Sequence, residues 1–151
     1  MPQINPIHCN RLSVPERPLL NKFYKSHGSA MRTSDGGEAW VARAGEIVGG
    51  LSLTPVPGGQ WLTGLLVTPA WRGKGVARWL VDNACGDERT WLFCHPDLQG
   101  FYERLRFVES EELPQPLADR LARYRRSKPL LAMCRGQSSL AGSSPGNSTS
   151  V

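Results

Sequence analysis

The chain has 151 residues, a formal net charge of +5 and a hydrophobic content of 40%. This length suits one domain whose core needs no disulfide or metal to stabilise it, and no apolar run is long enough to span a bilayer. The first residues also lack the basic and apolar regions of a signal peptide. We therefore expect a cytoplasmic protein with no membrane partner, whose modest positive charge favours anionic ligands.

The spacing of apolar residues predicts one helix and three strands in the first half of the chain. The expected elements are a helix over 15–27 and strands over 38–44, 46–53 and 61–67. Gly28 can end the helix, and Pro55 and Pro57 are expected to end the second strand. The third strand is almost entirely apolar, which predicts a central position covered on both faces.

The second half alternates between helical and strand patterns. The expected elements are a helix over 76–84, a strand over 90–94, helices over 97–105 and 116–124, and a strand over 129–134. Asp97 is expected to cap the helix that it begins. This order predicts an α/β fold with a mixed, mainly antiparallel central sheet flanked by helices. We expect one folded domain over 1–135 and a disordered tail, rich in Ser and Gly, over 136–151.

The four cysteines, Cys9, Cys85, Cys94 and Cys134, form no Cys-x-x-Cys pair. Zinc and redox sites commonly use such closely spaced pairs, and no combination of His, Cys and Asp has metal-ligand spacing. We therefore expect no metal, and we expect the cysteines to stay free and to pack as small apolar residues.

A loop with two glycines joins the third strand to the next helix. Residues 72–77 read Arg-Gly-Lys-Gly-Val-Ala. The free amides and the dipole at a helix N-terminus bind phosphate, glycines allow close backbone approach, and the arginine and lysine add positive charge. The Rossmann pattern fails because Arg78 stands where its third glycine is needed, and the P-loop pattern is absent. The loop therefore predicts a phosphate site of another type.

This loop resembles the motif [QR]-x-x-G-x-[GA] of the GNAT acetyltransferases, which follows a strand that ends in Val and then a Pro. The matching residues are Arg72, Gly75 and Ala77, preceded by Val67 and Pro69. With the rival nucleotide loops excluded, the resemblance implies that the phosphate belongs to coenzyme A.

A second block of the same family carries a Tyr on the next helix, soon followed by Gly-Phe. Phe101–Phe107 is similar to this block, with Tyr102 in place of the Tyr and Arg106 where the family usually has Gly. His95 departs as well, because the family often has Asn at that distance before the Tyr. The resemblance extends from about Pro15 to Cys134.

The resemblance implies direct transfer of an acetyl group from acetyl-CoA to a primary amine of a small molecule, peptide or protein, in a ternary complex. Tyr102 would act as the general acid for the departing thiolate. A backbone amide of the third strand would polarise the thioester, and Gly64 would form a bulge there or simply pack against a helix. The cofactor-binding residues would be Leu66, Val67, Arg72, Gly73, Lys74, Gly75, Val76, Ala77 and His95. No general base is assigned, since His95 and a water chain both remain candidates.

Two other functions stay open. The strand over 61–67 has no carboxylate that could act as the base, so the alternative is a non-catalytic module that binds acetyl-CoA and regulates a partner protein. Basic residues between Arg120 and Lys128 raise the question of nucleic acid, but neither an aromatic ladder nor a known motif accompanies them. We expect those residues to form a solvated helix face and expect no nucleic-acid partner. A homodimer is left open.

Overall fold

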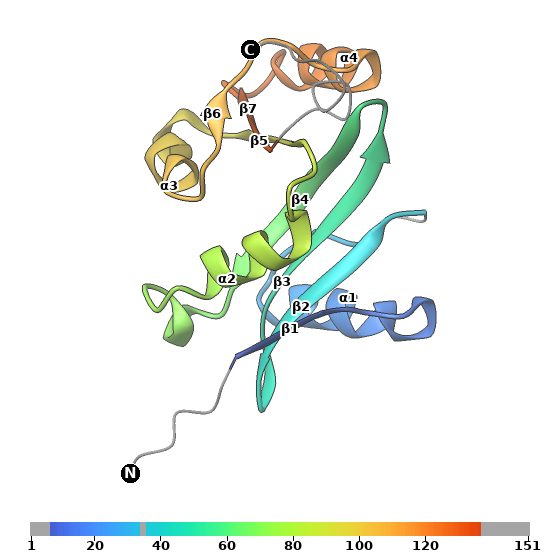
Figure 1. Cartoon of the computed structure of the whole chain (residues 1–151), viewed down its shortest axis with the longest axis vertical. Coiled ribbons are helices and arrows are strands. Elements are labelled where there is room, and N and C mark those ends of the chain that lie inside the picture. The colour runs from blue at the N-terminus through green and yellow to red at the C-terminus, as the bar shows by residue number, and fades with distance from the viewer. Residues whose placement is uncertain (1–6, 34–35, 137–151) are drawn as a thin grey trace. The chain divides into compact units, whose positions relative to one another are not determined.

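The computed structural model describes residues 7–33 and 36–136 and has the expected mixed α/β architecture (Figure 1). The strands are β1 (His8–Arg11), β2 (Glu38–Ala44), β3 (Glu46–Val56), β4 (Gly59–Val67), β5 (Thr90–Cys94), β6 (Val108–Glu109) and β7 (Leu131–Arg135). The helices are α1 (Arg17–Ser26), α2 (Val76–Cys85), α3 (Gln99–Glu103) and α4 (Gln115–Tyr124), with 3-10 turns η1 (Val14–Glu16), η2 (Pro69–Trp71) and η3 (Pro96–Leu98). The seven strands follow the order β1-β2-β3-β4-β5-β7-β6. Pairing is antiparallel for β1–β2, β2–β3, β5–β7 and β6–β7, and parallel for β4–β5.

Residue contacts divide the chain into two compact units, which are described separately. Unit 1 takes its described residues from 1–54 and 62–84, and unit 2 takes them from 55–61 and from 85 onward. Strands β3 and β4 each contribute to both units. The single domain over 1–135 stays a prediction, and residues 137–151 of the predicted tail lie outside the described residues.

The core of unit 1 forms where the apolar face of α1 packs on the sheet. Leu20, Phe23 and Tyr24 recur at helical spacing and are buried with Val41 of β2, and Figure 1 shows α1 beside β2. The helix ends as predicted at Gly28, whose φ is +70° and whose amide donates to the Lys25 carbonyl at 3.0 Å. This left-handed glycine cap stops the helix after its amphipathic face is complete.

In unit 2, alternation along β5 gives the strand two different faces. Trp91 packs with Leu117 of α4 and with Cys134, its partner on β7. Cys94 points to the opposite face, where its thiol lies 3.6 Å from the sulfur of Met133. Because side chains alternate between faces, α4 covers one face of the β5–β7 pair. The residues around α3 cover the other face.

Two strands were not predicted, and two local predictions were wrong. Strands β1 and β6 were missed because they are short edge strands with mostly exposed residues. Pro55 does not end β3, which runs to Val56; pairing with β2 stops at Leu53, so the missing proline amide loses no bond to β2. Asp97 caps no helix, because His95 occupies the cap position of η3.

Candidate functional site

The loop after β4 is anchored at its start by hydrogen bonds to two strands. The amide of Thr68 donates to the Val48 carbonyl of β3 at 2.8 Å. The Arg72 side chain turns back and its Nε donates to the carbonyl of Val67 at 2.9 Å. This leaves the terminal nitrogens of an exposed guanidinium next to the end of β4. The Arg72 charge is therefore fixed at the beginning of the loop rather than free to swing.

The centre of the loop exposes backbone. Gly73 and Gly75 have φ values of +76° and +85°, and a Cβ on either would meet no atom within 4 Å. The first helical bond of α2 runs from the Trp79 amide to the Gly75 carbonyl at 3.0 Å. The amides of Val76 and Ala77 therefore precede the first helical donor, as at any helix start. Open space, free amides and the exposed Lys74 together form an arrangement that can bind a phosphate group.

The start of α2 is held close to the sheet by a glycine that sequence reasoning missed. A Cβ at Gly49 of β3 would lie 3.3 Å from the Leu66 carbonyl oxygen and 3.3 Å from Cγ1 of Val76. Val76 is buried, and Leu66 is partly buried against the core of unit 1. The pair Gly49-Gly50 inside an apolar strand is the signal that indicates such close approach.

Within β4, Gly64 is coupled to Tyr24 of α1. The φ of Gly64 is +67°, a left-handed conformation that favours glycine, and its carbonyl accepts a hydrogen bond from the Tyr24 hydroxyl at 2.7 Å. A Cβ at Gly64 would lie 2.5 Å from that hydroxyl oxygen. Burial raises the pKa of Tyr24 to about 12, so the phenol is a hydrogen-bond donor at neutral pH. Gly64 therefore packs against helix α1, one of its two predicted roles, and the bulge stays a prediction.

In unit 2, Tyr102 lies on α3 with its ring between two other aromatic rings. The ring centroids of Phe101 and Phe107 lie 5.0 Å and 6.0 Å from it, both in edge-on geometry. Burial, followed by the nearby Cys94 thiol, raises the pKa of Tyr102 to about 12. No protein group in the described part of the chain hydrogen-bonds its hydroxyl. The Tyr102 ring is therefore held by its aromatic neighbours, and its hydroxyl is protonated at neutral pH and can donate a hydrogen bond to a ligand.

His95 caps the short turn that leads into α3. Its Nδ1 accepts a hydrogen bond from the Asp97 amide at 3.1 Å, and it lies 3.4 Å from Oδ2 of Asp97. The amide donor favours a proton on Nε2, whereas the Asp97 carboxylate favours one on Nδ1. His95 therefore stays a candidate base.

Helix α3 ends in a Schellman motif whose left-handed residue is Arg106. The φ of Arg106 is +73°, the only positive value at a non-glycine among the described residues. Its amide donates to the Glu103 carbonyl and the Phe107 amide donates to the Tyr102 carbonyl, both at 3.0 Å. This motif normally has glycine at its left-handed position. Helix α3 ends here although residue 106 is an arginine with a full side chain.

We expect Arg106→Gly to raise the free energy of unfolding by roughly 1 kcal/mol, because glycine relieves a left-handed conformation that costs an L residue about 1–2 kcal/mol, partly offset by a more flexible unfolded chain. Urea unfolding of the full chain measures this. Arg106→Ala is the control, since it removes the side chain and keeps the strain. Equal stability of the two variants would contradict the backbone explanation.

The predicted site residues thus fall into two groups. Unit 1 brings together Leu66, Val67 and the loop over 72–77, and unit 2 carries His95 and Tyr102. No group of three or more His, Cys, Asp or Glu side chains within 7–33 and 36–136 could hold a metal ion. In the same part of the chain, no helix is long and apolar enough to cross a membrane.

Comparison with known proteins gives a family model and a fold. Residues 35–109 match the model described as an acetyltransferase (GNAT) domain. The structure is similar to Escherichia coli ElaA, with 15% identity, a TM-score of 0.58, and coverage of 86% of this chain and 99% of that chain. A search of curated protein sequences finds no significant match.

Two of the similar structures contain coenzyme A. Rv2747 from Mycobacterium tuberculosis, in complex with CoA and NLQ, has 16% identity and a TM-score of 0.63, covering 86% of this chain and 99% of that chain. N-acetylglutamate synthase from Neisseria gonorrhoeae, complexed with coenzyme A and N-acetyl-glutamate, has 15% identity and a TM-score of 0.59, covering 85% of this chain and 34% of that chain. At these identities the likeness establishes the fold.

Proposed function

We propose that this chain, whose residues 35–109 match the model of a GNAT acetyltransferase domain, transfers the acetyl group of acetyl-CoA to a primary amine of a small molecule, peptide or protein by direct attack in a ternary complex. The observation that carries the proposal is the loop over 72–77, where open glycines, helix-start amides and two cations meet. Similar structures that contain coenzyme A support this choice of donor. We place the reaction in the cytoplasm.

The loop would hold the pyrophosphate of acetyl-CoA. The amides of the first turn of α2 would donate to the phosphate oxygens, and Arg72 and Lys74 would neutralise their charge. The empty space above Gly73 and Gly75 fits a ligand that must approach the backbone closely. Leu66 and Val67 would bind the pantetheine arm through their backbone, and the Nε2 hydrogen of His95 would donate to one of its carbonyls.

In the transfer step the amine nitrogen attacks the thioester carbon, the C–S bond breaks and the thiolate leaves. A free thiol has a pKa of roughly 8.5, below the value of about 12 for Tyr102. The phenol would therefore stabilise the thiolate mainly by donating a hydrogen bond while keeping its proton. The amine proton would pass to His95 or, through a chain of waters, to solvent.

Two measurements test the proposal in sequence. Acetyl-CoA should raise the melting temperature of the full chain by mass action, and free thiol should then be released when amines from a panel are added. No thermal shift at millimolar acetyl-CoA would refute the proposal. A thermal shift without thiol release across the panel would favour the alternative, a non-catalytic acetyl-CoA-binding module that regulates a partner protein.

Arg72→Glu is expected to weaken acetyl-CoA binding about 100-fold, because it removes a charge-assisted contact of about 1.5–3 kcal/mol and adds repulsion. Isothermal titration calorimetry at fixed ionic strength measures the Kd. Lys22→Glu is the matched control, since Lys22 is an exposed cation of α1 in the same unit. An unchanged Kd in Arg72→Glu would remove Arg72 from the proposed site.

A further inference from the structure

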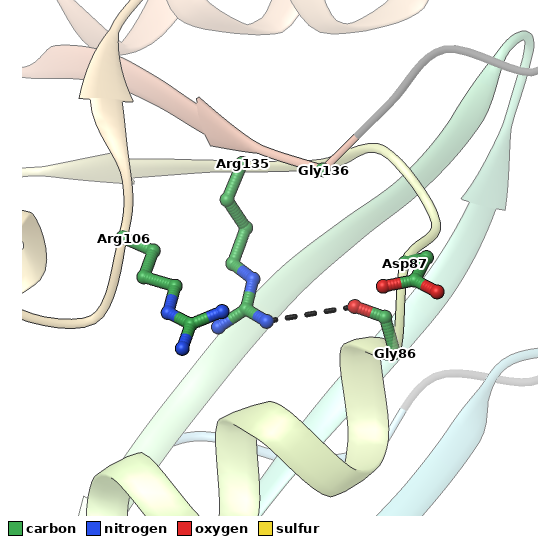
Figure 2. A pocket seen from close by; sticks show the side chains of 5 residues that line it. All are labelled: Gly86, Asp87, Arg106, Arg135 and Gly136. Atoms are coloured by element: carbon green, nitrogen blue, oxygen red, sulfur yellow. Dashed lines mark hydrogen bonds between the residues drawn. The ribbon is translucent and has the colours of Figure 1, made fainter.

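A cavity in unit 2 has no part in the proposed acetyl transfer. Its volume is about 320 Å³, and it is lined by Gly86, Asp87, Arg106, Arg135 and Gly136 (Figure 2). These residues come from the turn after α2, the end of α3 and the end of β7. We propose that this cavity binds a small oxyanion, a carboxylate or phosphate group, between the guanidinium groups of Arg106 and Arg135.

Arg135 supplies a fixed guanidinium. The residue is only 8% exposed, and its Nη1 donates to the Leu105 carbonyl at 3.1 Å. Its Nη2 lies 3.5 Å from the Gly86 carbonyl, the contact drawn in Figure 2. The guanidinium also lies over the Phe107 ring, 6.0 Å from its centroid. A charged group held this deeply is oriented before any ligand arrives, which lowers the ordering cost of binding.

Arg106 supplies the second guanidinium from the left-handed position that ends α3. Its positive φ is one that L residues rarely adopt, and the acetyltransferase motif usually has glycine at this position. In the part of the chain that the structure describes, the Arg106 side chain forms no hydrogen bond or ion pair with protein. It extends instead toward the cavity that Arg135 lines (Figure 2).

The lining determines the class of ligand. The Arg106 guanidinium is a planar fork that suits the paired oxygens of a carboxylate or a phosphate, and Arg135 adds a fixed positive charge. Asp87 lines the same cavity, so the charges of Arg106, Arg135 and Asp87 add up to +1. A net charge this small favours a ligand with one negative charge over a polyanion. The volume lies at the lower end of the range for small-molecule sites. A small metabolite with one oxyanion group meets these conditions.

The register of β5 places this cavity away from His95. Arg135 pairs with Thr90, the first residue of β5, whereas His95 directly follows Cys94, the last residue. The four residue steps from Thr90 to Cys94 span roughly 13 Å at the usual rise of a strand. The cavity is therefore not formed around His95, and its occupancy can be measured without any acetyl transfer.

We would titrate the full, isotopically labelled chain with inorganic phosphate or with acetate at constant ionic strength and follow amide NMR signals. Saturable shifts are expected at Gly86 and Gly136. Saturation by phosphate, by acetate or by both supports the proposal and identifies the preferred group, whereas saturation by neither overturns it. Phosphate also suits the loop over 72–77, so the titration is repeated in Arg72→Gln, where the shifts at Gly86 and Gly136 should persist.

Three variants test whether the residues that line the cavity bind the anion. Arg106→Gln should weaken it at least about tenfold, because one charge-assisted fork is lost. Asp87→Asn should strengthen it several-fold by removing a like charge. Arg123→Gln, an exposed arginine of α4 outside the cavity, is the matched control and should change nothing. Equal affinity in Arg106→Gln and the wild type would overturn the proposal, even if Arg135 variants fail to fold.

Discussion

Tyr102→Phe is expected to lower kcat about 100-fold, the usual loss when one hydrogen-bond donor to a developing anion is removed. The Kd of acetyl-CoA should change by less than about twofold, because the bond forms only as the thiolate departs. The phenol is held edge-on between Phe101 and Phe107, so Phe at position 102 keeps the packing. Thiol release on an acceptor identified from the amine panel, with calorimetry for the Kd, separates the two effects.

Tyr124→Phe is the matched control for this variant. Tyr124 also belongs to unit 2, but its side chain is 38% exposed and its ring packs edge-on against Phe93. It should retain full turnover. Because burial raises the pKa of Tyr102 to about 12, ionisation of this phenol should not reduce the wild-type rate between about pH 7 and 10. Full turnover in Tyr102→Phe would exclude Tyr102 from the chemistry.

Gly64→Ala is expected to reduce the free energy of unfolding by about 3 kcal/mol, from roughly 1–2 kcal/mol of left-handed strain and at least 1 kcal/mol of overpacking. The new methyl group would lie 2.5 Å from the Tyr24 hydroxyl oxygen and 3.3 Å from Cε of Met31. Urea unfolding at neutral pH measures the loss. Displacement of this part of β4 should also lower turnover.

Gly45→Ala separates the two contributions. Gly45 has a φ of +83° and nothing within 4 Å of a Cβ. Alanine at this position therefore lowers the free energy of unfolding through backbone strain alone. The same substitution at Gly64 should cost clearly more, and the excess should shrink in a Tyr24→Phe background, where the crowding oxygen is gone. Equal losses at Gly45 and Gly64 would show that Tyr24 does not constrain β4.

Alkaline pH adds a second readout of Tyr24. Its folded pKa of about 12 lies above the unfolded value near ~10, so the folded state holds the proton more tightly. The contribution of this proton to the free energy of unfolding is fully present below about pH 10, and it is lost as the pH rises through about 12. Tyr24→Phe should therefore make stability less sensitive to pH in that window, and Tyr102→Phe should do the same.

Sequence periodicity predicted the elements with strong patterns and missed those without one. The helix face of Leu20, Phe23 and Tyr24 and the apolar run of β4 are local signals, and both elements are where they were expected. Strands β1 and β6 have mostly exposed residues and gain their structure only by pairing with β2 and β7. Such edge strands are determined by neighbours that are distant in sequence.

The candidate site shows the same division. The loop over 72–77 could be read directly, because glycines and cations at a strand–helix junction have a local physical meaning. The bond from Tyr24 to Gly64 joins residues 40 positions apart, and nothing in either segment indicates the other. His95 shows the remaining limit, because a histidine after a strand is a candidate base by its type alone. Only the structure shows that its Nδ1 contacts the Asp97 amide and carboxylate.

The two units are interleaved along the chain, and this restricts how the protein can be rearranged. Unit 2 takes residues 55–61 from between two segments of unit 1, and Gln60 and Trp61 within that stretch pair with Thr90 and Trp91 of β5. A single recombination crossover therefore cannot transfer either unit intact. A crossover after Ala84 would graft a foreign β5 onto this β4, so the Gln60–Thr90 and Trp61–Trp91 pairs would have to be re-formed by the incoming sequence. Exchange of either unit between relatives would then require two crossovers or coordinated changes in both strands.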